Sequence, residues 1–196
     1  MKGALPFARG TRRARIERLG FAAIESWPVA SDGLLVGVAE PALGGAVPIA
    51  SSVKTMFIRI DRGELVWLIA PYASLEQEAA LCMAALVAEQ LKVDAQSVVL
   101  DVAINQSLQD VGLDAPPRPL VDLGNEAERS ISACAAVTRL LLMEAAAQVW
   151  GVTPADLLLG GDGVVRLAGT RHALRYGEIA ALAALMPLPG YVQIAG

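Results

Sequence analysis

The fold of this chain is decided by residues 54–103, which read KTMFIRIDRGELVWLIAPYASLEQEAALCMAALVAEQLKVDAQSVVLDVA. Val53–Ile60 and Glu64–Ala70 are rich in β-branched and large apolar side chains, and Asp61-Arg62-Gly63 separates them. Two such runs joined by a short segment containing glycine predict a β-hairpin. Ser97–Ala103 is dominated by Val and Leu and predicts a third strand.

A helix is predicted between the hairpin and the third strand. Ser74 and Gln77 have the spacing of a capping box, in which two side chains satisfy backbone N–H groups at a helix start. Every residue from Ala79 to Ala88 is apolar. A helix that is apolar on all sides is a buried helix. We therefore expect this helix to lie inside the core.

A second long helix is predicted in the later part of the chain. Asn125-Glu126-Ala127-Glu128 supplies an N-cap with Glu at the third position, and the helix then runs to Trp150. Gly151 follows as a C-cap glycine would. Thr153-Pro154-Ala155-Asp156 is a further capping box with proline at the first helical position. The fold class is therefore predicted to be α+β, with a small sheet and hairpins packed against two long helices.

The C-terminal part predicts a second hairpin. Leu157–Leu159 and Val164–Leu167 bracket the turn Gly160-Gly161-Asp162-Gly163. Arg171–Arg175 can add a strand, and Tyr176 begins a short helix. The glycine-rich turn lacks the Lys-Ser/Thr pair and the strand-to-helix context of a phosphate-binding loop. We interpret it as a turn.

Composition argues against several classes of protein. The 196 residues are enough for one domain, and 55% of them are hydrophobic. With 18% charged residues and a net charge of −4, the chain lacks the basic stripe of a nucleic-acid-binding protein. Mean hydropathy is +0.49, yet no run reaches the roughly 18 uninterrupted apolar residues of a transmembrane segment. The excess hydrophobicity indicates a surface buried against a partner protein, or an ordinary alanine-rich bias.

Isolated residues with reactive side chains give little indication of a site. Cys82 and Cys134 lie in predicted buried helices without the spacing of metal ligands, so we interpret both as small core hydrophobes. His172 is the single histidine and falls in a predicted edge strand. No Ser/Asp arrangement around it can be argued from the sequence. These patterns predict neither a catalytic residue nor a metal ligand.

Two runs carry a resemblance to a known family. Ala84–Asp94, followed by Val98-Val99-Leu100, is similar to the first molybdopterin-binding region of the large subunit of xanthine-dehydrogenase-family molybdenum hydroxylases. The branch it resembles is the isoquinoline 1-oxidoreductase beta subunit and aldehyde dehydrogenase type. Ala135–Val152 is similar to the next helix of that family. The resemblance covers approximately Val53 to Pro189, and it implies part of a molybdopterin-binding-domain-like architecture.

The resemblance implies a chemistry and a candidate residue. The family hydroxylates aldehydes or N-heterocycles at molybdenum and passes electrons to an iron–sulfur subunit. Its second molybdopterin-binding region and its general-base glutamate match nothing in this sequence. Gln77 matches a glutamine that lies beside the molybdenum in the family, which makes it the candidate cofactor-binding residue. Its place in the capping box gives it a structural role as an alternative.

The sequence departs from the family at both cofactor loops. Leu75-Glu76-Gln77-Glu78 stands where the family has Met-Gly-Gln-Gly, and Gly124–Arg129 replaces a longer Gly- and Ser-rich loop. Glycines let a backbone approach a ligand closely. A carboxylate about 4 Å from the cofactor's pyrophosphate is opposed by roughly 4 kcal/mol at an effective dielectric of about 20. Both loops therefore indicate helix starts that have gained stability where a site has been lost.

The first 52 residues differ from the rest of the chain. Thr11-Arg12-Arg13 and the basic cluster through Arg18 resemble a twin-arginine export signal, but Glu17, Glu25 and Asp32 interrupt its apolar core. We interpret residues 1–52 as a degenerate leader-like arm and linker, and residues 53–190 as the α+β domain. A degenerate leader favours the cytoplasm, whereas a working leader or export with a partner would place the chain in the periplasm.

Two hypotheses follow for function. In the first, the chain is part, or a degenerate paralogue, of a molybdenum hydroxylase large subunit. It would hold molybdopterin and act as a molybdenum-dependent oxidoreductase only with a partner, and alone it would hold no cofactor. That partner would be a complementary large-subunit portion, an iron–sulfur subunit, or both. In the second, it is a non-catalytic structural or assembly subunit that binds a hydrophobic partner surface without any cofactor.

Overall fold

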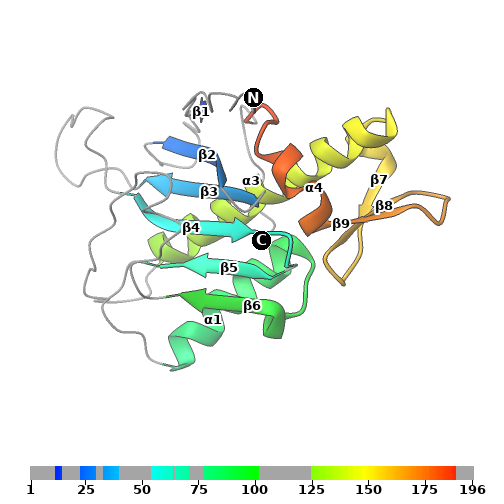
Figure 1. Ribbon diagram of the computed structural model, residues 1–196. Helices are drawn as coiled ribbons and strands as arrows, with labels where there is room; N and C mark the ends of the chain where they lie inside the picture. The colour runs from blue at the N-terminus through cyan, green and yellow to red at the C-terminus, as the bar shows by residue number, and fades with distance from the viewer. Residues whose placement is uncertain are drawn as a thin grey trace, which may run out of the picture.

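The protein is an α+β structure with two sheets (Figure 1), which confirms the predicted fold class. The computed structural model describes residues 12–14, 23–29, 33–39, 54–63, 65–70, 77–101 and 125–188. The six-stranded sheet has the strands in sequence order: β1 (Arg12–Ala14), β2 (Ala23–Val29), β3 (Gly33–Ala39), β4 (Lys54–Ile60), β5 (Val66–Ile69) and β6 (Val98–Asp101). The three-stranded sheet consists of β7 (Leu157–Leu159), β8 (Val164–Leu167) and β9 (Ala173–Arg175).

The helices begin and end close to the predicted positions. In the described part of the chain they are α1 (Gln77–Leu91), η3 (Ala95–Ser97), α3 (Asn125–Trp150), η4 (Pro154–Asp156) and α4 (Tyr176–Ala183). Gly151 follows α3 with a φ of +66°, the left-handed conformation that glycine adopts easily after a helix end. In the predicted capping box before η4, the Asp156 carboxylate accepts a hydrogen bond from the Thr153 N–H at 3.1 Å.

The predicted hairpin joins β4 to β5. The two strands are antiparallel, with Phe57 opposite Ile69, and the Gly63 N–H donates to Asp61 Oδ1 at 2.9 Å in the turn. The next pair differs, because β5 and β6 run parallel with Val66 opposite Val98. Parallel neighbours need a crossover connection, and α1 lies in it. The order strand, strand, helix, strand is therefore confirmed.

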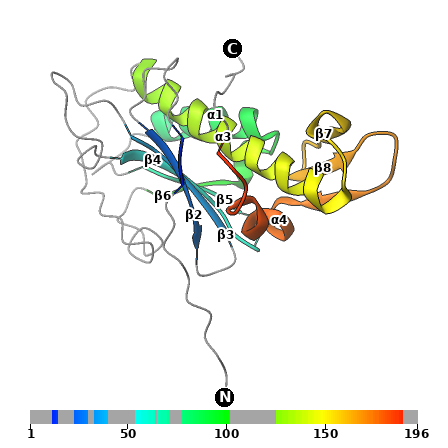
Figure 2. The same ribbon diagram turned by 90° about the horizontal axis from the view of Figure 1, so that it is seen from above.

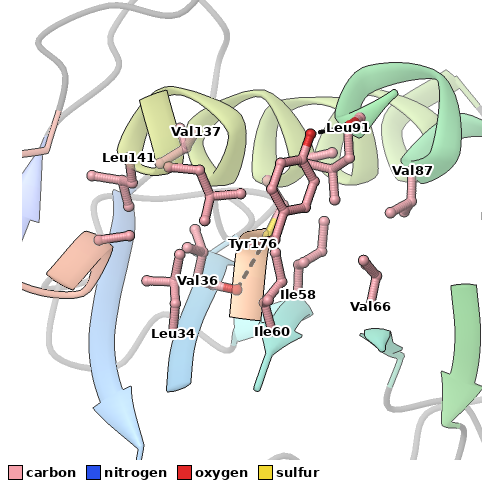
Figure 3. Close-up of a cluster of buried hydrophobic side chains, with 14 of the residues drawn as sticks. Leu34, Val36, Ile58, Ile60, Val66, Val87, Leu91, Val137, Leu141 and Tyr176 are labelled. Atoms are coloured by element: carbon pink, nitrogen blue, oxygen red, sulfur yellow. Dashed lines mark hydrogen bonds between the residues drawn. The ribbon is translucent and has the colours of Figure 1, made fainter. Parts of the chain in front are cut away.

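One face of the six-stranded sheet packs against the helices (Figure 2). Figure 3 shows this core, in which side chains of β3, β4 and β5 point toward those of α1 and α3. Its labelled members are Leu34, Val36, Ile58, Ile60, Val66, Val87, Leu91, Val137, Leu141 and Tyr176. On β3 and β4 the labelled residues are two positions apart (Leu34 and Val36, Ile58 and Ile60), as expected when one face of a strand faces a core.

Helix α3 is buried on all sides along part of its length. Every residue from Ser130 to Thr138 is buried, and most of these side chains are small. The Cys134 thiol donates to the Val36 carbonyl at 3.2 Å, which joins α3 to β3 (Figure 3). The buried Thr138 hydroxyl donates to the Cys134 carbonyl one turn earlier at 2.8 Å. Small side chains and internally satisfied hydroxyls let this helix lie deep in the protein.

The prediction of a buried helix at Ala79–Ala88 was wrong in one respect. The segment is helical, but Leu81 is 64% exposed, and Cys82 and Ala85 are exposed beside it. Met83 and Val87, on the opposite side, are buried in the core. A helix lying on a sheet meets it with one stripe only, and a run without polar residues does not mark which stripe faces outward. Of the two cysteines, only Cys134 is a core residue.

The expectation of an arm is corrected for the two strands Ala23–Val29 and Gly33–Ala39. Strands β2 and β3 lie within the main sheet, and β3 pairs with β4 through Leu34 opposite Ile60. Leu34 and Leu35 are fully buried, one on each face of the sheet. Because β3 contributes to the core, it belongs to the domain and not to a linker. The leader-like segment 15–22, the linker residues 40–53 and the domain end at 189–190 fall outside the described residues.

The other face of the main sheet is also apolar. Leu35, Phe57 and Ile69 form a second buried cluster with Val29, and Trp67 packs against it partly buried. Strands β3, β4 and β5 alternate between this cluster and the helix-facing core, so these three strands bury apolar side chains on both sides. A strand buried on both faces reads as a continuous apolar run, which explains the sequence of β5.

The three-stranded sheet packs at one end of the helices (Figure 1). Its predicted turn is confirmed, since the Gly160 N–H donates to the Val164 carbonyl at 2.9 Å. The Tyr176 hydroxyl, at the start of α4, donates to the Leu91 carbonyl at the end of α1 at 2.5 Å. At Gly177 a Cβ atom would lie 2.8 Å from the Asp61 carbonyl oxygen, so α4 abuts the β4–β5 turn closely.

Helix α3 is also long and apolar enough to cross a membrane. Within Glu128–Trp150 an 18-residue window has a mean hydropathy of 1.4, and in the described part of the chain this is the one helix that meets the test. However, 78% of the apolar window is buried inside the protein. A core helix passes the same test, so this feature is weak evidence for a membrane span.

Candidate functional site

Gln77, the candidate cofactor-binding residue, is the first residue of α1. Its side chain and that of Glu78 are both exposed. Residues 71–76, including the predicted cap Ser74, fall outside the described part of the chain, so the capping box stays a prediction. The structure thus places Gln77 at a helix start, where the exposed N–H groups and the helix dipole favour negative charge.

An acidic residue lies beside Gln77 in the first turn of α1. A helix N-terminus can bind phosphate through its free N–H groups, but the Glu78 carboxylate already provides negative charge in this first turn. In the described ranges, no three His, Cys, Asp or Glu side chains gather as metal ligands would. Gln77 is therefore placed where a capping or dipole role suits it.

Two buried residues with reactive side chains have structural roles. Burial raises the pKa of the Cys134 thiol, and the thiol donates to the Val36 carbonyl. Burial likewise raises the pKa of the Tyr176 hydroxyl, which donates to the Leu91 carbonyl. Both groups stay protonated at neutral pH, and each joins elements that are far apart in sequence. Neither is placed to act as a nucleophile or a general base.

The polar residues of the second hairpin hold its turns. Arg166 and Asp162 form an exposed ion pair at 2.8 Å across the glycine-rich turn. His172 is exposed, and its backbone N–H donates to Thr170 Oγ1 at 3.1 Å. The hydrogen bonds from the Thr153 hydroxyl and N–H lower the pKa of Asp156, which is fully exposed. These contacts support the interpretation of this region as a turn-rich structural unit.

The surface that the sequence did not predict lies on α1. Counted from the exposed Glu78, the exposed residues Leu81, Cys82 and Ala85 are at i+3, i+4 and i+7, and the exposed Glu89 follows at i+11. We call these five residues the outer α1 face. Residues at this spacing share one side of a helix. In the sequence two glutamates bound the apolar run, but no residue within the run marks which side is exposed.

Comparisons with known proteins give a distant structural likeness. No protein-family model matches the chain, and no curated protein matches it. Among solved structures, the chain is similar to quinoline 2-oxidoreductase from Pseudomonas putida 86, with 19% sequence identity and a TM-score of 0.47. The match covers 82% of this chain and 21% of that one, so the chain spans about a fifth of that protein's length.

Proposed function

We propose that the chain is a non-catalytic part, or a degenerate paralogue, of the large subunit of a molybdenum hydroxylase that oxidises aldehydes or N-heterocycles. The proposal is supported by the family-like runs Ala84–Asp94 and Ala135–Val152. In the structure the first run covers the second half of α1 and the turn that follows it, and the second covers most of α3. The likeness thus concerns the elements that build the core.

The observation that carries the non-catalytic role is the position of Gln77. This residue is exposed in the first turn of α1, with the exposed Glu78 beside it. Each carboxylate at a helix start complements the helix dipole and opposes a bound anion. The same residues that stabilise the helix therefore disfavour the cofactor. A chain with this helix start acts as a packing module, and molybdopterin would be held only where a partner supplied the rest of the site.

The proposal implies a protein partner, either a complementary portion of the large subunit or an iron–sulfur subunit. The exposed apolar side chains of the outer α1 face support it, since a solvent-facing helix stripe is usually charged or polar.

Elemental analysis tests this function. The isolated chain should contain no stoichiometric molybdenum and should not oxidise aldehydes or N-heterocycles with a dye acceptor. Any complex that co-purifies with the chain is analysed with Gln77→Ala and with Gln148→Ala, an exposed glutamine on α3, as the matched control. Stoichiometric molybdenum in the isolated chain would overturn the non-catalytic role. Molybdenum held only in a complex, and lost in Q77A but not in Q148A, would assign Gln77 to a shared site.

A second candidate is a structural or assembly subunit that never contacts a cofactor. The outer α1 face favours it as well, because an apolar docking surface needs no metal. The two candidates differ in the complex: a partnered complex that contains no molybdenum in either variant supports the cofactor-free subunit.

A further inference from the structure

We propose that the outer α1 face docks an amphipathic helix of a partner protein, one that carries Lys or Arg at both ends of its apolar stripe. The inference deepens the proposed function, since it rests on the chain working as a module of a larger assembly. It names the chemistry of the partner segment and the surface that receives it.

Helix α1 is exposed on one side and buried on the other. Leu81 is 64% exposed, and Cys82 and Ala85 are exposed beside it on the same face. The opposite side of the same helix, with Met83 and Val87, is fully buried in the core. Helix α1 is thus packed against the core on one side and presents an apolar stripe on the other. A partner helix can lay its own apolar stripe against such a face, as in other helix-mediated recognition.

The outer α1 face carries an acidic side chain at each end. Glu78 and Glu89 bound the apolar stripe and are separated by about 16 Å along the helix axis at about 1.5 Å per residue. Lys92, the next exposed charge, follows the last residue of α1 and has a left-handed φ of 53°. Both ends of the face are therefore acidic. A partner with basic side chains at matching positions would pair with them, and complementary charges fix register and suppress wrong partners.

The same charges disfavour other occupants. In a twofold pair of α1 faces, each glutamate would meet a glutamate of the second copy, and like charges repel. Anionic lipid headgroups and nucleic-acid phosphates would be repelled in the same way, because helices that lie on such surfaces carry basic residues beside their apolar stripe. A basic-ended helix is the occupant that matches both the apolar centre and the acidic ends.

Cys82 provides a direct readout on the full chain. It is exposed in the middle of the face, whereas Cys134 is buried and bonded to the Val36 carbonyl. In the folded protein, Ellman's reagent should therefore react at Cys82 alone. The probe is a synthetic amphipathic helical peptide with a leucine and alanine stripe and a lysine at each end, about 16 Å apart. Its matched control has glutamate in place of each lysine.

We expect the basic-ended peptide to slow the reaction of Cys82, and to do so at concentrations about fivefold lower than the acidic-ended peptide, as expected for two exposed ion pairs. Leu81→Glu should abolish the protection, while Val149→Glu, at an exposed apolar residue of α3, should not. The double variant Glu78→Lys, Glu89→Lys should reverse the preference in favour of the acidic-ended peptide.

Equal protection by both peptides, or protection by neither, would overturn the proposal. So would slowing that depends on the concentration of the chain alone, because that result would assign the face to a second copy. The reaction rate of Cys82 tests the docking face, and the metal analysis tests the proposed function, so either can be overturned without the other. Molybdenum in the isolated chain would overturn the proposed function whatever the peptides do, and loss of protection would overturn the docking face whatever the metal content.

Discussion

Helices α1 and α3 are both rich in apolar residues, but they differ in which residues they bury. In α3 the hydroxyl residues Ser130 and Thr138 are completely buried. In α1 a leucine, Leu81, is 64% exposed. Helix α3 thus buries polar side chains, whereas α1 exposes a large apolar one. In this protein a helix is buried deeply when its side chains are small and their polar groups are hydrogen-bonded. The hydropathy of its sequence matters less.

The physical basis of the difference is local. A hydroxyl in a helix can donate to a carbonyl of the preceding turn, as Thr138 donates to Cys134, so its burial leaves no unpaired donor. An exposed leucine leaves no polar group unpaired, so its penalty is smaller than that of a buried hydroxyl without a partner. Small side chains also allow close approach, so the segment 130–138 can be packed from every side.

The largest test of the comparison is a matched pair of truncations. Leu141→Ala in α3 removes a fully buried side chain and should lower the free energy of unfolding by about 2–5 kcal/mol, through lost burial and the cavity left behind. Leu81→Ala in α1 should change it by no more than about 0.5 kcal/mol. Urea unfolding of both variants measures the difference. Similar losses in the two variants would mean that α1 is buried on both sides.

An intermediate effect is expected for enlarged alanines. Ala135 is fully buried in α3, and Ala135→Leu should cost about 1–3 kcal/mol of stability because the surrounding side chains must move. Ala85→Leu, on the outer α1 face, adds the same atoms where there is space and should be nearly neutral in the isolated chain. Thermal unfolding followed by circular dichroism compares them. A neutral Ala135→Leu would show that the packing around α3 is loose.

The smallest effect concerns the bond that joins the end of α1 to α4. Burial raises the pKa of Tyr176 in the folded state, so above the ordinary tyrosine pKa of about 10 the unfolded chain releases this proton and the folded chain keeps it. Stability contributed by the protonated hydroxyl is therefore complete below about pH 10 and falls above it, by up to about 1.4 kcal/mol per pH unit. Urea unfolding between pH 8 and 11 measures the slope.

Tyr176→Phe isolates this contribution. The variant cannot titrate at this position, so its stability should fall less steeply above about pH 10 than that of the parent chain. The buried thiol of Cys134, whose pKa is also raised, remains in both proteins and provides the common background. An unchanged slope in the variant would mean that the Tyr176 hydroxyl is not buried in solution.

Much of the fold could be predicted from local sequence, because the signals were local. The β4–β5 hairpin, the end of α3 at Gly151 and the turn before β8 each depend on residues only a few positions apart. Strands β2 and β3 could not, since Glu25 and Pro28 break the apolar alternation of β2. Their place depends on pairing with β4, which follows in the sequence. Pro28 lies beyond the described pairing of β1 with β2, which ends at Ser26, and it is opposite Leu34 of β3.

The candidate site shows the same division. The place of Gln77 at a helix start could be predicted, since capping signals are local. The outer α1 face could not, because Ala79–Ala88 contains no polar residue to mark the exposed side. Which side of this helix meets the core is decided by α3, the later helix, together with the sheet.

The hydrogen bond between Cys134 and Val36 also has a consequence for how the protein is made. It spans 98 residues of the chain, and translation adds about 5–20 residues per second. About 5–20 s therefore pass between the synthesis of Val36 in β3 and the synthesis of Cys134 in the helix that covers it. During that interval the apolar face of a nascent sheet is open to other chains and to chaperones, so the yield of folded protein should depend on the rate of translation through residues 36–134.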